Sequence, residues 1–144
     1  MGLPYQPRAG DILMCEFPAC FDAPEMTKTR PVIVVSPRLS GRMFSLATVV
    51  PISGAEPHVH CDHHGPIPVR LLPKFMQATG KGRWAKCDMV YTLSTHRLRP
   101  VERGLRDNPG QRLYEYPRLD LATLRAVPLA IAAGVGIDAS LWSD

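Results

Sequence analysis

A positively charged side chain and a hydroxyl flank two apolar runs within residues 25–54. The runs, Val32–Ser36 and Leu46–Ile52, are rich in β-branched residues and predict buried strands. Arg30 precedes the first run and Ser53 follows the second, so pairing of the two strands would bring them to one end of a sheet. A guanidinium can fork two hydrogen bonds onto phosphate oxygens, so this combination suits phosphate handling.

A second pair of charged side chains lies in Trp84–Leu93, which alternates in the manner of a last long core strand. Because successive side chains on a strand point to opposite faces, Lys86 and Asp88 are expected on one face and Cys87 in the core. This two-residue spacing is what a catalytic pair on a strand requires. Cys87 is interpreted as a small apolar residue, since an active thiolate needs an exposed, positively charged setting.

Five short motifs, taken in order, resemble those of the MazF/PemK/Kid toxins, which are small bacterial endoribonucleases of toxin–antitoxin systems. The motifs are Gly10-Asp11-Ile12, Glu25-x4-Arg30-Pro31, V-x-S at 34–36, V-V-P-I-S at 49–53 and Lys86-Cys87-Asp88. The resemblance covers roughly residues 10–101, with a weaker similarity in the C-terminal helix. No single motif is specific, but the ordered set is.

The resemblance implies a metal-independent endoribonuclease without a cofactor. It would use the 2′-OH of single-stranded RNA as nucleophile and leave a 2′,3′-cyclic phosphate and a 5′-OH. Asp88 is the expected general base, with Glu25 as the alternative. Arg30 would stabilise the charge of the phosphorane, and Ser53, where the family usually has Thr, would donate its hydroxyl to the same phosphate. Lys86 replaces a catalytic Arg of the family; it can give a proton but lacks the bidentate fork.

These residues also have plainer interpretations. Arg30 and Glu25 can form a surface ion pair, worth at most about 1 kcal/mol. Ser53 before Gly54 can simply form a turn. Further basic residues are candidates either for contacts to the RNA backbone or for solubilising surface charge: Lys28, Arg38, Arg42, Lys81 and Arg83.

The fold that the resemblance implies is mainly β, a small SH3-like β-barrel with a C-terminal helix. A single domain is expected over residues 1–144, with the barrel core at about 10–101 and an extension with the helix at 102–144. The family is normally homodimeric and binds RNA in the dimer groove. The acidic, partly disordered tail of a cognate antitoxin covers that groove.

The remaining elements follow from local patterns. Strands are expected at Asp11–Phe17 and Arg112–Tyr116, with loops at Pro18–Thr29 and Gln77–Arg83. A further strand is implied at Pro68–Leu72, which resembles the next strand of the toxin family. Asp120 is a good N-cap for a helix that Pro128 should kink or split. The apolar stripe and the terminating glycines of that helix are Leu124, Val127, Ile131, Val135, Gly134 and Gly136.

Composition narrows the class of partner and the compartment. A formal charge of +4 and a pI near 9.1 favour a polyanion, such as RNA or an acidic peptide. Four cysteines without a C-x-x-C pair, and the lack of a signal peptide, favour reduced thiols in a cytoplasmic protein. No apolar run reaches the roughly 20 residues that a membrane-spanning helix needs.

A tract rich in histidine and cysteine leaves a further possibility open. His58, His60, Cys61 and His64 could supply zinc ligands, although a polar hairpin loop is the favoured interpretation. Two alternatives to the nuclease therefore remain. One is a zinc-stabilised nucleic-acid-binding module; the other is a non-catalytic toxin on the same fold that inhibits gyrase by contact alone.

Overall fold

The computed structural model describes residues 3–37, 45–103 and 113–137. Its main sheet has seven strands. They are β1 (Ile12–Glu16), β2 (Thr29–Val34), β3 (Leu46–Ser53), β4 (His64–Ile67), β5 (Arg83–Lys86), β6 (Tyr91–Ser94) and β7 (Leu98–Arg99). Two short strands, β8 (Val101–Glu102) and β9 (Tyr114–Glu115), pair separately. The helices are η1 (Val69–Leu71), α1 (Lys74–Gln77), η2 (Thr95–Arg97) and α2 (Leu121–Gly134).

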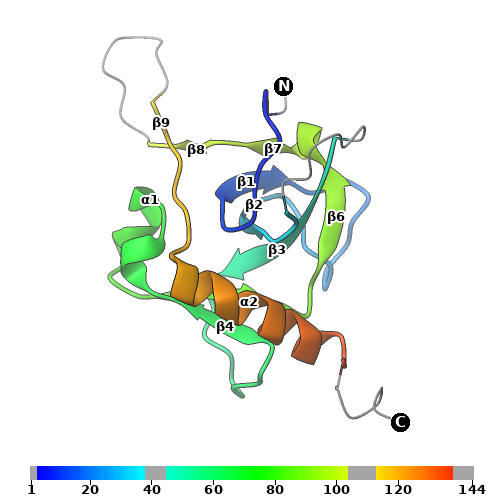
Figure 1. Ribbon diagram of the computed structural model, residues 1–144, viewed down its shortest axis with the longest axis vertical. Coiled ribbons are helices and arrows are strands. Elements are labelled where there is room, and N and C mark those ends of the chain that lie inside the picture. Colours follow the sequence, from blue (N-terminus) through cyan, green and yellow to red (C-terminus); the bar gives the residue numbers. More distant parts are fainter. Residues whose placement is uncertain (1–2, 38–44, 104–112, 138–144) are drawn as a thin grey trace.

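The longest strand, β3, organises the sheet. It pairs antiparallel with β2 along one edge, and along the other edge first with β6 and then with β5. The strand order is β4-β5-β3-β2-β1-β7, and within the described residues the two end strands do not pair, so the sheet stays open. The prediction of a mainly β fold with a C-terminal helix is confirmed (Figure 1).

Both faces of this sheet are buried, which explains why its strands read as continuous apolar runs. Along β2, Ile33 contributes to one core cluster, and Val32 and Val34 contribute to the other, as strand alternation requires. The Ile33 cluster includes Val127 of α2, which runs beside β4 (Figure 1). The other cluster is covered by partly buried side chains of the N-terminal segment and the β1–β2 connection, namely Leu3, Phe21 and Met26.

Two predicted strands are wrong. The segment predicted as a strand at residues 68–72 is the 3₁₀ helix η1, where Leu71 N–H donates to Pro68 O at 3.1 Å. Trp84–Leu93 is not one strand, because a turn closed by Met89 N–H on Lys86 O separates β5 from β6. The physical reason for the turn is that both strands pair with the same edge of β3 but at different positions along it.

Helix α2 begins where the sequence predicts. The Asp120 carboxylate accepts a hydrogen bond from Thr123 N–H at 2.9 Å, and Arg70 donates to it at 2.7 Å. The helix is not split at Pro128, whose ring lies on the exposed side. It ends as expected at the glycines: Gly136 adopts φ 76°, and the next N–H, of Ile137, bonds back to Ala132 O. None of the helices in the described segments is long and apolar enough to cross a membrane.

Candidate nucleic-acid interface

The end of the sheet at which β3 finishes gathers positive charge and a hydroxyl. Because β2 and β5 both run antiparallel to β3, their first residues lie beside its last ones. Arg30 is near the start of β2, Ser53 ends β3 and Arg83 begins β5. The structure thus brings Arg30 and Ser53 to one end of the sheet, and it adds Arg83 to them.

The hydroxyl of Ser53 is held in a local turn. Its Oγ accepts a hydrogen bond from Ala55 N–H at 3.2 Å, while its backbone pairs with Trp84 of β5. The turn-forming interpretation is therefore observed. It does not exclude the phosphate role, since accepting a bond through oxygen leaves the hydroxyl proton able to donate.

The Arg30 side chain is exposed at the rim. Its Nε donates to Thr27 O at 3.2 Å, a bond within the segment that leads into β2. No ion pair joins Arg30 to Glu25 in the described parts of the chain, so the surface-pair interpretation is not observed. Glu25 is exposed in the β1–β2 connection, where its N–H closes a turn on Asp22 O.

The guanidinium of Arg83 lies directly on the backbone of Gly54. A Cβ at position 54 would collide with Arg83 Nη1, so only glycine admits the arginine in this place. Arg83 Nε is buried and has no hydrogen-bond partner within the described residues. A buried N–H of a charged group without a partner is costly, and a bound anion would satisfy it.

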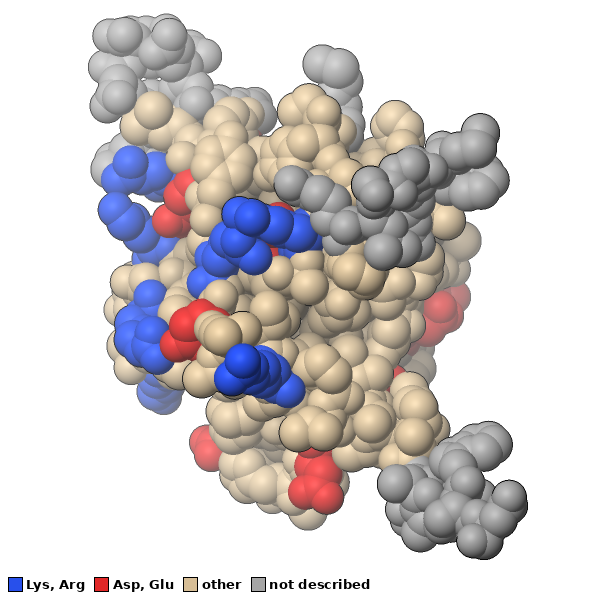
Figure 2. Space-filling view, in the orientation of Figure 1, with Lys and Arg blue, Asp and Glu red and all other residues tan. Residues whose placement is uncertain are grey.

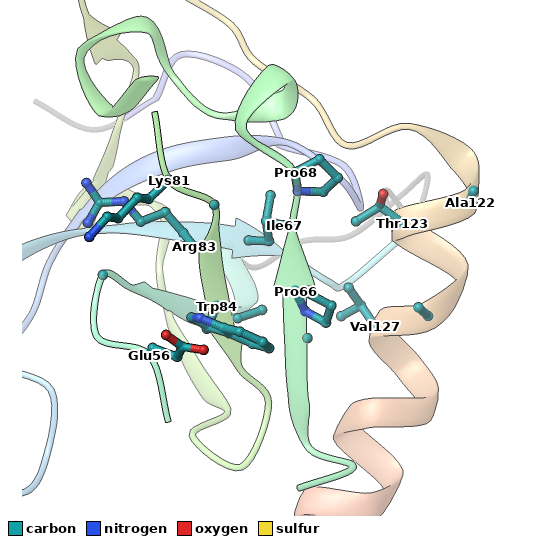
Figure 3. Close-up of a pocket in the computed structure, with 15 residues that line it drawn as sticks. Glu56, Pro66, Ile67, Pro68, Lys81, Arg83, Trp84, Ala122, Thr123 and Val127 are labelled. Atoms are coloured by element: carbon teal, nitrogen blue, oxygen red, sulfur yellow. The ribbon is translucent and has the colours of Figure 1, made fainter. Parts of the chain in front are cut away.

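A cavity of about 800 Å³ opens beside this arginine. Figure 3 shows Arg83 and Lys81 on one side, Trp84 and Pro66 at the centre, and Val127 of α2 on the far wall. Its other lining residues include Glu56, Ile67, Pro68, Ala122 and Thr123. An apolar cavity with a tryptophan and a basic rim suits an unstacked base with its phosphate.

Local sequence patterns do not predict this cavity, because its far wall comes from α2, about forty residues away along the chain. One signal was available: alternation along residues 84–88 places Trp84 on the face of Lys86, outside the core.

Lys86 and Asp88 are at the other end of β5. Lys86 is its last residue, and three strand residues from Arg83 span about 10 Å. Asp88 lies in the turn that follows, with its side chain 38% exposed, and Gly134 of α2 packs closely against that turn. The structure keeps these two residues together, but apart from the Arg30–Ser53–Arg83 end.

Two histidines lie close to Asp88 at the Lys86 end of β5, which is called its lower end from here on. His63 Nε2 lies 3.8 Å from Asp88 Oδ2, and His64 pairs with Lys86 between β4 and β5. Partial burial lowers the pKa of the His64 imidazole, and the neighbouring His63 lowers it further. A neutral His64 is therefore favoured at pH 7.

The structure changes the set of potential metal ligands that the sequence suggested. Cys61, His63 and His64 offer ligand atoms within 4.8 Å of one another, so His63 joins the group and His58 does not. His60 is turned away: it lies 3.7 Å from Glu56 and stacks near Trp84 at a ring distance of 5.0 Å.

The two buried thiols are unreactive. Burial raises the pKa of Cys87 to about 11 and that of Cys15 to about 12. The interpretation of Cys87 as a core residue is confirmed.

The remaining basic residues are spread over several elements. Lys28 is exposed with φ 65° just before β2, and Lys81 is exposed in the loop before β5. Arg38 and Arg42 lie outside the described residues. Figure 2 shows blue side chains interleaved with red ones on one half of the face that it presents. Several basic residues are in ion pairs, such as Arg70 with Asp120 and Arg118 with Asp11.

Comparison with known proteins identifies a family and a fold. Residues 8–109 match the family model described as PemK-like, MazF-like toxin of type II toxin-antitoxin system. No curated protein sequence matches the chain.

Among solved structures, MazF from Deinococcus radiodurans is similar at TM-score 0.63 and 16% identity, over 92% of this chain and 98% of the other. An endoribonuclease from a mycobacterial species aligns at TM-score 0.59 and 15% identity, over 92% and 94%. A MazE–MazF complex from D. radiodurans aligns at 0.57 and 18%, over 93% and 100%. At these identities the structural matches establish the fold.

Proposed function

This chain belongs to the PemK-like, MazF-like toxins of type II toxin–antitoxin systems, and from that premise we propose that it is a metal-independent endoribonuclease acting on single-stranded RNA. The observation that carries the proposal is the convergence of Arg30, Ser53 and Arg83 at one end of the sheet, beside a cavity that contains Trp84. The structural neighbours named as endoribonucleases support it.

The chemistry follows from what this end of the sheet offers. The ribose 2′-OH attacks the adjacent phosphorus, its proton passes to a carboxylate, and the 5′ oxygen leaves with a proton. The products are a 2′,3′-cyclic phosphate and a 5′-OH. Arg30 stabilises the extra negative charge of the phosphorane, because a guanidinium keeps its charge and can form two parallel hydrogen bonds. Ser53 donates its hydroxyl to the same phosphate.

The base is either Asp88 or Glu25. Asp88 is the candidate of the family pattern, and Lys86 beside it is the proton donor to the leaving oxygen. Glu25 is the candidate in the segment that leads into Arg30. Because Asp88 follows the end of β5 that is remote from Arg83 and Ser53, participation of Asp88 requires an RNA strand that spans both sites, or a second protomer that supplies one of them.

We assign the positioning of the RNA backbone to the basic side chains at the rim. Lys28, Lys81 and Arg83 are exposed or half-exposed around the end of the sheet where Arg30 lies. Arg38 and Arg42 are assigned the same role from the sequence alone. An unpaired base enters the cavity against Trp84, which makes the enzyme selective for single strands.

The assembly is proposed to be a homodimer in the cytoplasm, inhibited by a cognate antitoxin whose acidic segment occupies the RNA site. Neighbouring structures named as complexes with MazE or with a cognate antitoxin support that partner. The net charge of +4 favours an acidic segment as well as RNA.

The test is cleavage of single-stranded RNA by purified protein in EDTA. Wild type should cut and leave 2′,3′-cyclic ends, and Arg30→Ala should cut about 10²–10³-fold more slowly, the usual effect of losing one preorganised transition-state contact. Arg125→Ala, an exposed arginine on α2, is the matched control and should cut like wild type. Abolition of cutting by EDTA, or full activity of Arg30→Ala, would refute the mechanism. Growth arrest without RNA fragments would instead indicate a non-catalytic toxin.

A further inference from the structure

We propose that Cys61, His63 and His64 form a surface site for a zinc ion, beside the candidate base Asp88 and with none of the three ligands assigned a role in cleavage. The three residues lie in the turn that leads into β4, and their ligand atoms are all within 4.8 Å of one another. A thiolate and two imidazoles are a donor set that Zn²⁺ prefers, and three protein ligands leave a fourth position open to water.

The turn is held in shape by its own backbone. His64 N–H donates to Cys61 O at 3.0 Å, and Cys87 N–H donates to His63 O at 3.2 Å. The first bond closes the turn, and the second ties it to the connection between β5 and β6. The three ligands therefore start from an ordered frame, which reduces the conformational entropy lost on binding.

Only a small rearrangement separates this geometry from coordination. With Zn–S near 2.3 Å and Zn–N near 2.0 Å, one sulfur and two nitrogens in a tetrahedral site are about 3.3–3.5 Å apart. Because the ligand atoms lie up to 4.8 Å from one another, they must approach each other by roughly 1 Å to bind the ion. Rotation of exposed or half-exposed side chains can supply such a movement, and these three are of that kind.

Two existing hydrogen bonds must give way, and the weaker is the long contact of 3.8 Å that Cys61 Sγ donates to Val59 O. His64 Nδ1 accepts from Cys61 N–H at 3.0 Å, so that lone pair is already aimed back at the cysteine. A metal that takes the lone pair displaces a hydrogen bond worth about 1 kcal/mol, which is small beside the free energy of zinc coordination. Binding also converts the Cys61 thiol into a thiolate, and its proton passes to the buffer.

Asp88 completes the surroundings without being one of the three ligands. Its Oδ2 lies 3.8 Å from His63 Nε2, within reach of an outer hydrogen bond after a small adjustment. A carboxylate that accepts from the second nitrogen of a ligating histidine orients the ring and increases its basicity. His63 then coordinates through Nδ1.

The first experiment titrates the full-length reduced protein with Co²⁺ and then with Zn²⁺. One Co²⁺ per chain should bind and give visible d–d bands together with a thiolate-to-cobalt band in the near ultraviolet, and one equivalent of Zn²⁺ should abolish both. Cys61→Ser should remove the thiolate band and weaken binding by more than 10-fold. Cys20→Ser, the other exposed cysteine, should change neither.

Four further variants separate ligands from neighbours. His63→Ala and His64→Ala should each weaken Zn²⁺ binding at least as much as Asp88→Asn, for which an outer partner predicts a loss of about 10–100-fold. His58→Ala should bind like wild type. Circular dichroism should show that each variant is folded.

The proposal is overturned if the thiolate band survives in Cys61→Ser, if Cys20→Ser removes it, or if wild type binds no Co²⁺. These outcomes do not depend on RNA cleavage, and cleavage in EDTA does not depend on them. Failure of either proposal can therefore be recognised without the other.

Discussion

The two ends of β5 differ in chemistry although the strand is only four residues long. At the upper end, where β5 begins, the Arg83 guanidinium lies on Gly54, beside Ser53 and an apolar cavity. Its buried Nε has no hydrogen-bond partner among the described residues. At the lower end Asp88 meets His63, and an exposed cysteine lies nearby. The first environment suits a phosphate, and the second suits a proton or a metal ion. In the proposed account, one short strand separates a site for an anion from groups that could bind cations.

The largest effect on the cleavage rate is expected from removing the general base, which tests which end of β5 supplies it. Removing the general base should slow cleavage about 10²–10⁴-fold. We expect Asp88→Asn to show this loss and Glu25→Gln to stay within about 10-fold of wild type. Single-turnover rates on a short RNA measure both. The opposite ranking would assign the base to the β1–β2 connection and leave the lower end without a catalytic role.

Gly134→Ala tests the support of the lower end. The new Cβ would stand 2.7–2.9 Å from backbone atoms of Cys87 and Asp88, which cannot turn aside as a side chain can. Overpacking of this kind typically lowers the free energy of unfolding by about 1–3 kcal/mol, and urea denaturation would measure it. Unchanged stability would show that α2 does not hold the Asp88 turn in place.

Gly54→Ala is the matched change at the upper end. Its Cβ would meet the guanidinium of Arg83, a flexible group that can swing away, so stability should change little. RNA affinity should fall about 5–150-fold, the equivalent of one charged contact at about 1–3 kcal/mol. Binding to a 2′-deoxy-substituted RNA, which cannot be cut, measures this loss. Equal stability losses in the two glycine variants would remove the contrast between the ends.

The smallest effect is expected on the stability of the fold at acidic pH. Hydrogen bonds from Thr123, and then the bond from Arg70, hold the pKa of Asp120 at about 2, below its ordinary 3.8. A depressed carboxyl pKa stabilises the fold above pH 3.8 and loses that contribution as the pH falls toward 2. Asp120→Ala should therefore be less stable than wild type at pH 7, by a margin that narrows below pH 4. A constant margin in denaturation curves from pH 7 to pH 3 would contradict this origin.

The sequence allowed much of the fold to be predicted, because β-branched runs and prolines locate β2 and β3, and Asp120 locates the start of α2. It misled where the chain pairs twice with one strand: residues 84–93 alternate throughout, yet the chain turns after Lys86, and β5 and β6 each pair with β3. The pairing of Arg30 with Ser53 followed from two strand ends. The place of Arg83 did not, because it depends on the missing Cβ of Gly54. His63 was missed as a ligand because a turn, rather than a regular spacing, brings it to Cys61 and His64.

The central claim is that phosphate is bound where β3 ends. Amide chemical shifts of ¹⁵N-labelled protein, recorded with and without the 2′-deoxy-substituted RNA, test it most directly. The account predicts the largest shifts at Arg30, Ser53 and Arg83 and at the indole N–H of Trp84. Shifts confined to the turn of residues 61–64 and to Asp88, with Arg30 and Ser53 unmoved, would contradict it.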